Sequence, residues 1–259
     1  MDYIHSLIKY IKYKSKAHNL HGLHSPFVYS LYENVIGTEQ QYYFFVNAEI
    51  LRNELLQNET KIEKIELGTG NKKNKKIKIS NIAKTVLKSS KEAQLMFKLV
   101  NYFQPKNILE IGTSLGLTTS YIAAANSNAN VVTLEGCPNT LAVAKSNFEK
   151  LRIKNVTTHL GNFDEILPPV LSKMQTLDLV FFDGNHRYEP TMNYFNLSLE
   201  KSNENSVFVF DDIHWSAEMT KAWEEIQNHK QVTVTIDLFS VGLVFFRTQQ
   251  AKQHFILKF

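Results

Sequence analysis

The sequence predicts an α/β fold, in which a mostly parallel sheet of seven strands ends in an antiparallel pair and is preceded by a helical N-terminal extension. Two observations support this prediction. Short apolar runs alternate with helix-forming segments after residue 89, which is typical of a parallel sheet covered by helices on both faces. The last two apolar runs are joined only by Phe239 and Ser240, and so short a connection requires an antiparallel hairpin.

Residues 1–88 are expected to form the helical extension, and residues 89–259 the main domain. Ser25 is a typical N-cap and Pro26 suits the first turn of a helix, so a helix is predicted to begin there. A second helix is predicted for residues 41–57, which carry an apolar face. Because such short amphipathic helices need a surface to pack on, we expect them to serve the main domain as a lid or substrate wall.

The main domain is predicted to open with a helix that starts in a capping box, Ser89 paired with Glu92. Five apolar strands separated by helices should follow, and a hairpin should end the sheet. The expected strands are Ile108–Ile111, Val131–Leu134, Val156–Leu160, Leu179–Phe182, Val207–Phe210, and the hairpin pair Val232–Leu238 and Val241–Phe246.

The charge balance argues against a dedicated nucleic-acid-binding protein. The net charge is only +4, which lacks the dense positive charge of that class. Part of the excess is local, in five lysines between residues 72 and 78. Together with the preceding segment Gly68–Asn71, these lysines are interpreted as a solvated polar loop and as the best candidate for a mobile segment.

The single cysteine, Cys137, excludes a disulfide within the chain. No stretch approaches the ~20 apolar residues that a membrane-spanning helix needs. The first residues, 4–14, read as a basic amphipathic helix that is expected to pack on the protein's own core rather than on a membrane surface. We therefore expect a cytoplasmic protein with no membrane partner; its oligomeric state is open, and a homodimer is one candidate.

The most informative stretch runs from Asn107 to Thr119. An apolar run there ends in Glu110, a turn containing Gly112 and Gly116 follows, and a helix-forming segment comes next. The glycines let the backbone approach a ligand closely. Their spacing, Glu-x-Gly-x-x-x-Gly, differs from the Gly-x-Gly-x-x-Gly that seats a pyrophosphate in dinucleotide enzymes.

Polar or acidic side chains also follow the other four predicted parallel strands. These are Glu135, the segment Asn162-Phe163-Asp164, Asp183 and Asp211-Asp212. In doubly wound sheets, ligands bind at the carboxyl ends of the strands. Any one of these positions is explained as readily by a helix cap or an ordinary turn, but five in order predict a ligand site.

The spacing around Glu110 resembles motif I of the class I S-adenosylmethionine-dependent methyltransferases, and the terminal hairpin matches their Rossmann-like sheet. The resemblance covers residues 89–259. It implies that S-adenosylmethionine is the cofactor, that Glu135 accepts hydrogen bonds from its ribose and that Asn162 and Phe163 lie at its adenine. The implied cofactor-binding residues are Glu110, Gly112, Thr113, Ser114, Gly116, Thr118, Glu135, Gly136, Asn162, Phe163 and Asp183.

The segments 181–186 and 210–215 look most like those of small-molecule O-methyltransferases of the catechol and caffeoyl-CoA type and their bacterial relatives. This resemblance implies a divalent metal held by Asp183, Asp211 and Asp212. Three carboxylates suit an oxygen-preferring cation such as Mg²⁺. The metal would lower the pKa of a substrate hydroxyl and position its oxygen.

The sequence departs from that metal-binding pattern twice. Asp212 stands where an asparagine is usual, and Asn185-His186 stands where an acid and a lysine are common. A metal-free site is therefore the alternative, with His214 or His186 as the general base. The candidate catalytic residues are Asp183, His186 and His214.

Taken together, the resemblance implies methyl transfer to a hydroxyl group of a small-molecule acceptor. An amine or a protein side chain as acceptor is the first alternative. The second is a non-catalytic cofactor-binding module whose helical N-terminus serves a partner protein. Nucleic-acid methylation is disfavoured by the modest charge and by the absence of the Asn/Asp-Pro-Pro-Tyr/Phe motif of enzymes that flip bases.

Overall fold

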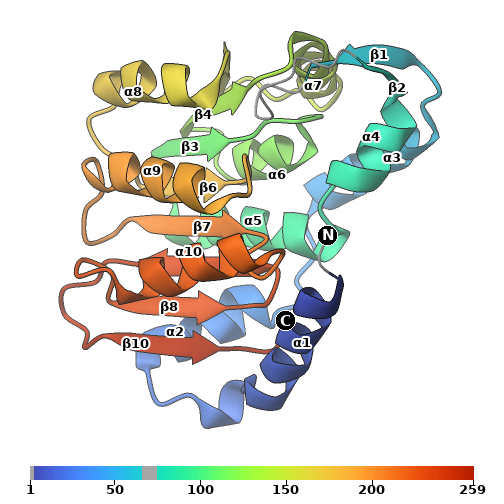
Figure 1. The fold of residues 1–259 in the computed structure, drawn as a ribbon. Helices are drawn as coiled ribbons and strands as arrows, with labels where there is room; N and C mark the ends of the chain where they lie inside the picture. Colours follow the sequence, from blue (N-terminus) through green and yellow to red (C-terminus); the bar gives the residue numbers. More distant parts are fainter. Residues whose placement is uncertain (1–2, 66–74) are drawn as a thin grey trace. The chain divides into compact units, whose positions relative to one another are not determined.

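The computed structural model describes residues 3–65 and 75–259. Its contacts divide the chain into two compact units, Met1–Thr38 with Leu171–Phe259 (unit 1) and Glu39–Val170 (unit 2). Figure 1 shows the helices and strands of both units. Within the described residues the main sheet has eight strands. The predicted α/β class and mostly parallel sheet are confirmed, and the predicted count of seven strands is wrong by one.

Unit 2 contains three parallel strands in the order β3-β4-β5, each followed by a helix. The elements are β3 (Asn107–Ile111), α6 (Leu117–Ala125), β4 (Asn130–Glu135), α7 (Pro138–Lys150), β5 (Val156–Leu160) and α8 (Phe163–Lys173). Ile111 lies opposite Leu134, and Glu135 lies opposite Leu160. The carboxyl ends of the three strands are therefore aligned, so the turns that follow them share one edge of the sheet.

The part of unit 2 before β3 is not wholly helical, contrary to the prediction for residues 1–88. It contains α3 (Tyr43–Gln57), β1 (Lys61–Lys64), β2 (Lys75–Lys78), α4 (Ile79–Val86) and α5 (Ser90–Phe103). β1 and β2 form an antiparallel pair. The predicted polar loop at residues 68–71, with Lys72 and Lys73, lies outside the described residues. The capping box of Ser89 and Glu92 at the start of α5 is confirmed.

A compact apolar cluster joins α3 and α4 to α5 and α6. Its buried members include Phe45, Ala48, Leu51, Leu55, Ile82, Phe97, Leu115 and Tyr121. A polar network reinforces it, because the carboxylate of Glu49 accepts hydrogen bonds from Tyr121 and Ser90 at 2.7 Å each. Residues 39–88 therefore complete the core of unit 2 rather than standing apart from it.

Unit 1 contains five strands in the order β10-β8-β9-β7-β6. Its elements are α1 (Tyr3–Lys16), η1 (Leu20–Gly22), α2 (Pro26–Leu31), η2 (Tyr32–Ile36), β6 (Leu179–Phe182), α9 (Tyr188–Leu199), β7 (Val207–Asp211), α10 (Ala217–Asn228), β8 (Val234–Asp237), β9 (Val241–Phe245) and β10 (Gln253–Ile256). β8 and β9 form the predicted antiparallel hairpin. The unpredicted strand, β10, pairs with β8 in parallel.

The two faces of the strands in unit 1 carry different helices. Helices α9 and α10 cover one face of these strands (Figure 1). Phe208 and Phe210 of β7 point to that face, where the ring of Phe195 lies 6.3 Å and 5.9 Å from them. Phe245 of β9 lies opposite Val207 in the register and so points to the other face. There it meets Phe27 of α2, with ring centroids 5.0 Å apart. Ser25 caps α2 as predicted.

The two ends of the chain are hydrogen-bonded to each other within unit 1. The amide of His18 donates to the carbonyl of Ile256 at 2.8 Å, and the amide of Lys258 donates to the carbonyl of His18 at 3.1 Å. The Tyr13 hydroxyl donates to the carbonyl of Leu257 at 2.6 Å. The N-terminal segment is therefore held by the strand that ends the chain.

Candidate functional site

The turn after β3 has the backbone conformation that its glycines predict. Gly112 and Gly116 have φ angles of 111° and 75°, and Ser114 between them has φ 49°. The amides of Gly112 and Thr113 both donate to the carbonyl of Leu134 at 3.0 Å. The turn is therefore tied to the end of β4, and Gly116 then starts α6.

Gly116 also has a packing role, which the sequence did not predict. The sequence suggested that its missing Cβ makes room for a ligand. A Cβ at this position would lie 2.7 Å from Cε1 of Phe148 and 2.9 Å from Cβ of Ala144, both on α7. The space that the glycine leaves open is thus occupied by α7, and the residue serves packing as well as the turn.

Glu110, on β3, is fully buried in a network of hydroxyl groups. Its Oε2 accepts hydrogen bonds from Thr119 at 2.5 Å and Thr133 at 2.6 Å. Because Thr133 uses its proton on Glu110, the contact of 2.6 Å between Thr133 and Thr113 needs Thr113 as the donor. Burial raises the pKa of Glu110 to about 7, although the hydrogen bonds from Thr119 and Thr133 lower it. Oε1 of Glu110 has no hydrogen-bond partner among the described residues.

Glu135, at the end of β4, is oriented by backbone amides. Ser114 donates to its Oε2 at 2.8 Å, and Cys137 donates to its Oε1 at 2.9 Å. Burial raises the pKa of Glu135, and the amides of Cys137, Ser114 and Gly136 act in the opposite direction. A carboxylate has about four acceptor positions. The carboxylate is thus held in place by the turn after β3 and still has capacity for a ligand hydroxyl.

Asn162 caps the helix that follows β5. Its Oδ1 accepts from the amide of Asp164 at 3.2 Å, and its carbonyl accepts from the amides of Glu165 and Ile166. Phe163 is the first residue of α8 and is half-buried. The cap that the sequence offered as the alternative explanation is therefore present. The side-chain NH₂ of Asn162 takes no part in this cap.

Ten of the eleven predicted cofactor-binding residues thus belong to unit 2, where they follow the aligned ends of β3, β4 and β5 or start the next helix. Thr118 lies in the first turn of α6 and is half-buried. The eleventh residue, Asp183, belongs to unit 1. No sequence motif marks Thr119 and Thr133, the threonines that bind Glu110. Thr133 could have been predicted, however, because it lies in the strand next to that of Glu110.

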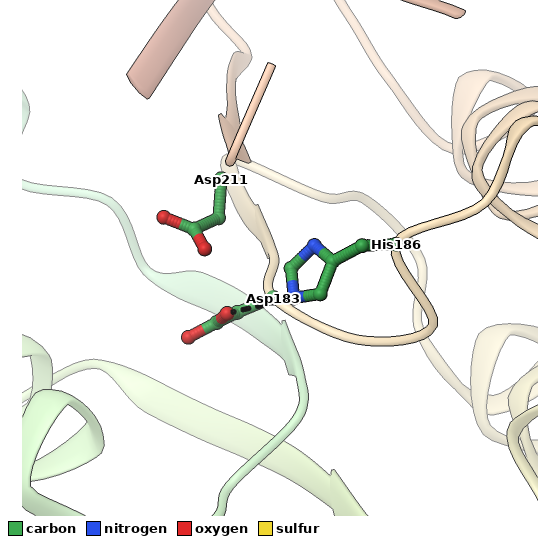
Figure 2. A group of neighbouring side chains, drawn as sticks. All are labelled: Asp183, His186 and Asp211. Atoms are coloured by element: carbon green, nitrogen blue, oxygen red, sulfur yellow. Dashed lines mark ion pairs between the residues drawn. The ribbon is translucent and has the colours of Figure 1, made fainter. Parts of the chain in front are cut away.

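Asp183, His186 and Asp211 form a cluster in unit 1 (Figure 2). The parallel register of β6 and β7 places Phe182 opposite Phe210, so the next residues, Asp183 and Asp211, follow at the same edge. One ligand atom of each residue lies within 4.8 Å of the others, and His186 Nε2 is 3.6 Å from Asp183 Oδ1. Asp211 is buried and the other two are half-buried.

The third predicted metal ligand, Asp212, is not in this cluster. It adopts φ 55° in the turn after β7, where its carbonyl accepts from the amide of Trp215 at 2.9 Å. In the described part of the chain it belongs to no group that could hold a metal ion. His186, which the sequence offered as a general base, takes the third position.

His214, the other candidate base, pairs with an acid that the sequence did not single out. Its Nε2 lies 2.7 Å from Oδ2 of Asp237, the last residue of β8, and both side chains are nearly buried. Oδ1 of Asp237 accepts from the amide of Phe239 at 2.8 Å. Nδ1 of His214 is buried and has no hydrogen-bond partner within residues 3–65 and 75–259. The sequence did not predict Asp237 as a site residue, because the prediction rested on the ends of the five parallel strands alone.

Residues 109–213 match a family model described as a methyltransferase domain. A catechol O-methyltransferase of Niastella koreensis is 30% identical over 128 residues, which are 48% of this chain and 57% of the relative. An uncharacterised protein of Acanthamoeba polyphaga mimivirus is 28% identical over 146 residues, 51% of this chain and 65% of that protein. The match thus spans less than two thirds of each of these relatives.

The fold is shared with solved methyltransferases. An O-methyltransferase of Bacillus cereus, solved in complex with S-adenosylhomocysteine, superposes with a TM-score of 0.58 at 18% identity over 83% of this chain and 95% of that one. The chain therefore shares the Rossmann-like fold of a solved methyltransferase, and its residues 109–213 are similar in sequence to a methyltransferase domain.

Proposed function

We propose that this chain is a class I methyltransferase, which transfers the methyl group of S-adenosylmethionine to a hydroxyl group of a small molecule. The single observation that carries the proposal is the acid-and-glycine turn of unit 2. There Glu110 and Glu135 stand near the ends of adjacent strands, and the amide of Ser114, in the turn after β3, donates to Glu135. The names of the similar proteins, a catechol O-methyltransferase among them, support a hydroxyl acceptor.

The residues of unit 2 fit the cofactor. Oε1 of Glu110 is a buried polar atom without a protein partner in the described chain, and such an atom is costly unless a ligand or water satisfies it. Glu135 keeps acceptor capacity for the ribose hydroxyls. Asn162 and Phe163 would serve the adenine. When bound, S-adenosylmethionine supplies a methyl group already activated by its sulfonium, so the protein's main task is to align donor and acceptor.

The proton of the acceptor hydroxyl can be taken by His214. The 2.7 Å contact favours the tautomer in which Nε2–H donates to Asp237, and this leaves the lone pair of Nδ1 as the basic site. His186 is the second candidate, and its Nε2 lies 3.6 Å from Oδ1 of Asp183.

The cluster of Asp183, His186 and Asp211 fits a divalent cation. Two carboxylates within 4.8 Å of each other repel, and burial of Asp211 increases the cost. A cation would offset this repulsion and lower the pKa of a hydroxyl bound to it. The imidazole nitrogen shifts the preference from Mg²⁺ toward Mn²⁺, Fe²⁺ or Zn²⁺.

The alternatives to a hydroxyl acceptor remain an amine, a protein side chain or a non-catalytic role.

Calorimetry with S-adenosylhomocysteine tests the cofactor assignment. Glu135→Ala should weaken binding by about tenfold to a hundredfold, because charge-assisted hydrogen bonds are lost. Glu149→Ala, which removes an exposed acid from α7, is the matched control and should bind as the wild type does. Equal affinity in the two variants would overturn the assignment.

Methyl-transfer assays with matched pairs of acceptors test whether the acceptor group is a hydroxyl. Catechols and the corresponding aromatic amines should be offered with the same methyl donor, with and without added Mn²⁺. Preference for the catechol supports the proposal. Preference for the amine supports the first alternative, and cofactor binding without any transfer supports the non-catalytic one.

A further inference from the structure

The helix α1 is anchored to unit 1 by one face. Tyr10 and Tyr13 lie on that face, and their rings are 4.9 Å and 5.4 Å from the ring of Phe239. The Tyr13 hydroxyl is bonded to the carbonyl of Leu257, and the Tyr13 side chain is buried. These contacts fix which face of α1 points away from the unit.

The outward face of α1 is apolar. Leu7, Ile8 and Ile11 are 58%, 49% and 60% exposed. In an α-helix residues four and three positions apart lie on the same side, so Ile11 adjoins both of the others and the three form one strip. Single exposed apolar residues are common, but a contiguous strip is typical of a surface that meets a partner. The helix thus packs on the protein's own core through Tyr10 and Tyr13, as expected, and leaves this strip exposed.

Lysines border the strip on both sides. At about 100° per residue, Lys14 lies beside Leu7 on one edge and Lys12 lies beyond Ile8 on the other. Lys16 continues the second edge, and α1 contains no acidic residue. Lys14 also lies 5.4 Å from the ring centroid of Tyr10, at the boundary between the two faces. The outward face thus has an apolar centre and positive margins.

We propose that α1 docks on an anionic phospholipid surface, with Leu7, Ile8 and Ile11 below the head groups and Lys12 and Lys14 at their phosphates. This pattern is that of a helix lying in the plane of a membrane interface, and lysine stems can reach from the apolar layer to the charged one. No helix in the described part of the chain is long and apolar enough to cross a membrane. The helix therefore lies on the surface.

A second copy of the chain fits the strip less well than lipid does. In a symmetric contact the lysine margins of one helix would meet those of the other, and like charges repel. Anionic head groups instead complement both margins at once. The proposal does not depend on the methyltransferase activity, because α1 is not part of the candidate site.

Vesicle flotation of the full-length protein tests the proposal. The protein should float with vesicles of phosphatidylcholine and phosphatidylglycerol in equal parts, and much less with phosphatidylcholine alone. Leu7→Ser with Ile11→Ser should weaken binding by about tenfold or more, since the buried apolar area supplies most of the affinity. Val46→Ser with Ile50→Ser is the matched control, because these α3 residues are 64% and 54% exposed. Thermal unfolding checks that both variants fold.

Charge and oligomer measurements complete the test. Lys12→Gln with Lys14→Gln, and raised salt, should each reduce flotation with anionic vesicles. Equal binding to both vesicle types, no binding to either, or unchanged binding of the Leu7→Ser, Ile11→Ser variant would overturn the proposal. It would also be overturned if sedimentation showed a wild-type dimer that this variant abolishes, because the strip would then belong to a second copy.

Discussion

At the scale of single residues, Glu110 couples folding to pH. Its pKa is about 7 in the folded protein, against an ordinary value of 4.5. Between these values the unfolded chain loses the proton while the folded protein keeps it. Glu110 therefore lowers the free energy of unfolding as pH rises through this window, by up to about 3 kcal/mol in total. Above the folded pKa it changes the stability no further.

Glu110→Gln should remove that pH dependence, because glutamine is neutral at every pH. Urea unfolding from about pH 5 to about pH 8 should show a wild-type stability that declines more steeply than that of the variant. Glu135, whose pKa burial also raises, contributes in the same direction in both proteins and cancels in the comparison. Parallel curves for the two proteins would contradict the assignment.

The pairing of His214 with Asp237 makes a prediction at the same scale. Asp237→Asn keeps the shape of the side chain but removes the carboxylate that orients the imidazole. The rate of methyl transfer should fall by about a hundredfold if His214 is the base. The affinity for S-adenosylhomocysteine should not change, since neither His214 nor Asp237 is among the predicted cofactor-binding residues. An unchanged rate would leave His186 as the base.

At the scale of elements, the turn after β3 depends on packing by α7. Gly116→Ala should destabilise the protein by at least about 2 kcal/mol, because φ is 75° and a Cβ would clash with Phe148 and Ala144. Urea unfolding measures the loss. A double-mutant cycle with Phe148→Leu should show a smaller loss, since the smaller side chain relieves the clash. An equal loss in both backgrounds would assign the cost to the backbone conformation alone.

The predicted division at residue 88 can be tested through the elements that precede it. A chain that begins at Ser89 lacks α3 and α4, and this would expose the side of α5 and α6 that contacts Phe45, Leu51 and Leu55. We expect it to be poorly soluble and without methyl-transfer activity. Circular dichroism and gel filtration measure the first effect. A soluble, fully active truncated chain would show that the extension is dispensable, and the lid interpretation would then be wrong.

Most strands that the sequence predicted correctly have a continuous apolar pattern, although β5, also predicted, has a mixed burial pattern. β6 and β7 are buried along their whole length, and their bounds match the prediction to within one residue. β10 and the pair β1 and β2 have at most half-buried, mixed patterns, so periodicity does not distinguish them from loops. Edge strands of this kind depend on pairing partners that are distant in the sequence.

The site was predictable to the extent that it follows from strand ends. Asp183 and Asp211 were expected together because parallel strands share an edge, and the register bears this out. The choice between Asp212 and His186 depends on two turns, and their conformations could not be derived from periodicity. Asp237 meets His214 across 23 positions of the chain through the hairpin, a tertiary contact without a local signal.

At the scale of the whole molecule, the first and last segments of the chain form one structure. Tyr13 links them, because its hydroxyl donates to the carbonyl of Leu257 at 2.6 Å and accepts from the amide of Phe259 at 3.2 Å. Burial raises the pKa of this hydroxyl to about 12, so it remains a donor at neutral pH. The loss of its hydrogen bonds should therefore destabilise the structure at both ends of the chain.

Tyr13→Phe should destabilise the paired ends by about 1 kcal/mol, the typical net contribution of a hydrogen bond. In hydrogen exchange, the amides of His18 and Lys258 should be exposed together and about fivefold faster than in the wild type, although 240 positions separate them. Amides of β4, in unit 2, should exchange at the wild-type rate. Tyr10→Phe is the control, since Tyr10 contacts Phe239 through its ring and that contact is kept. If His18 and Lys258 responded separately, or if β4 accelerated as well, the two ends would not form one local cooperative unit.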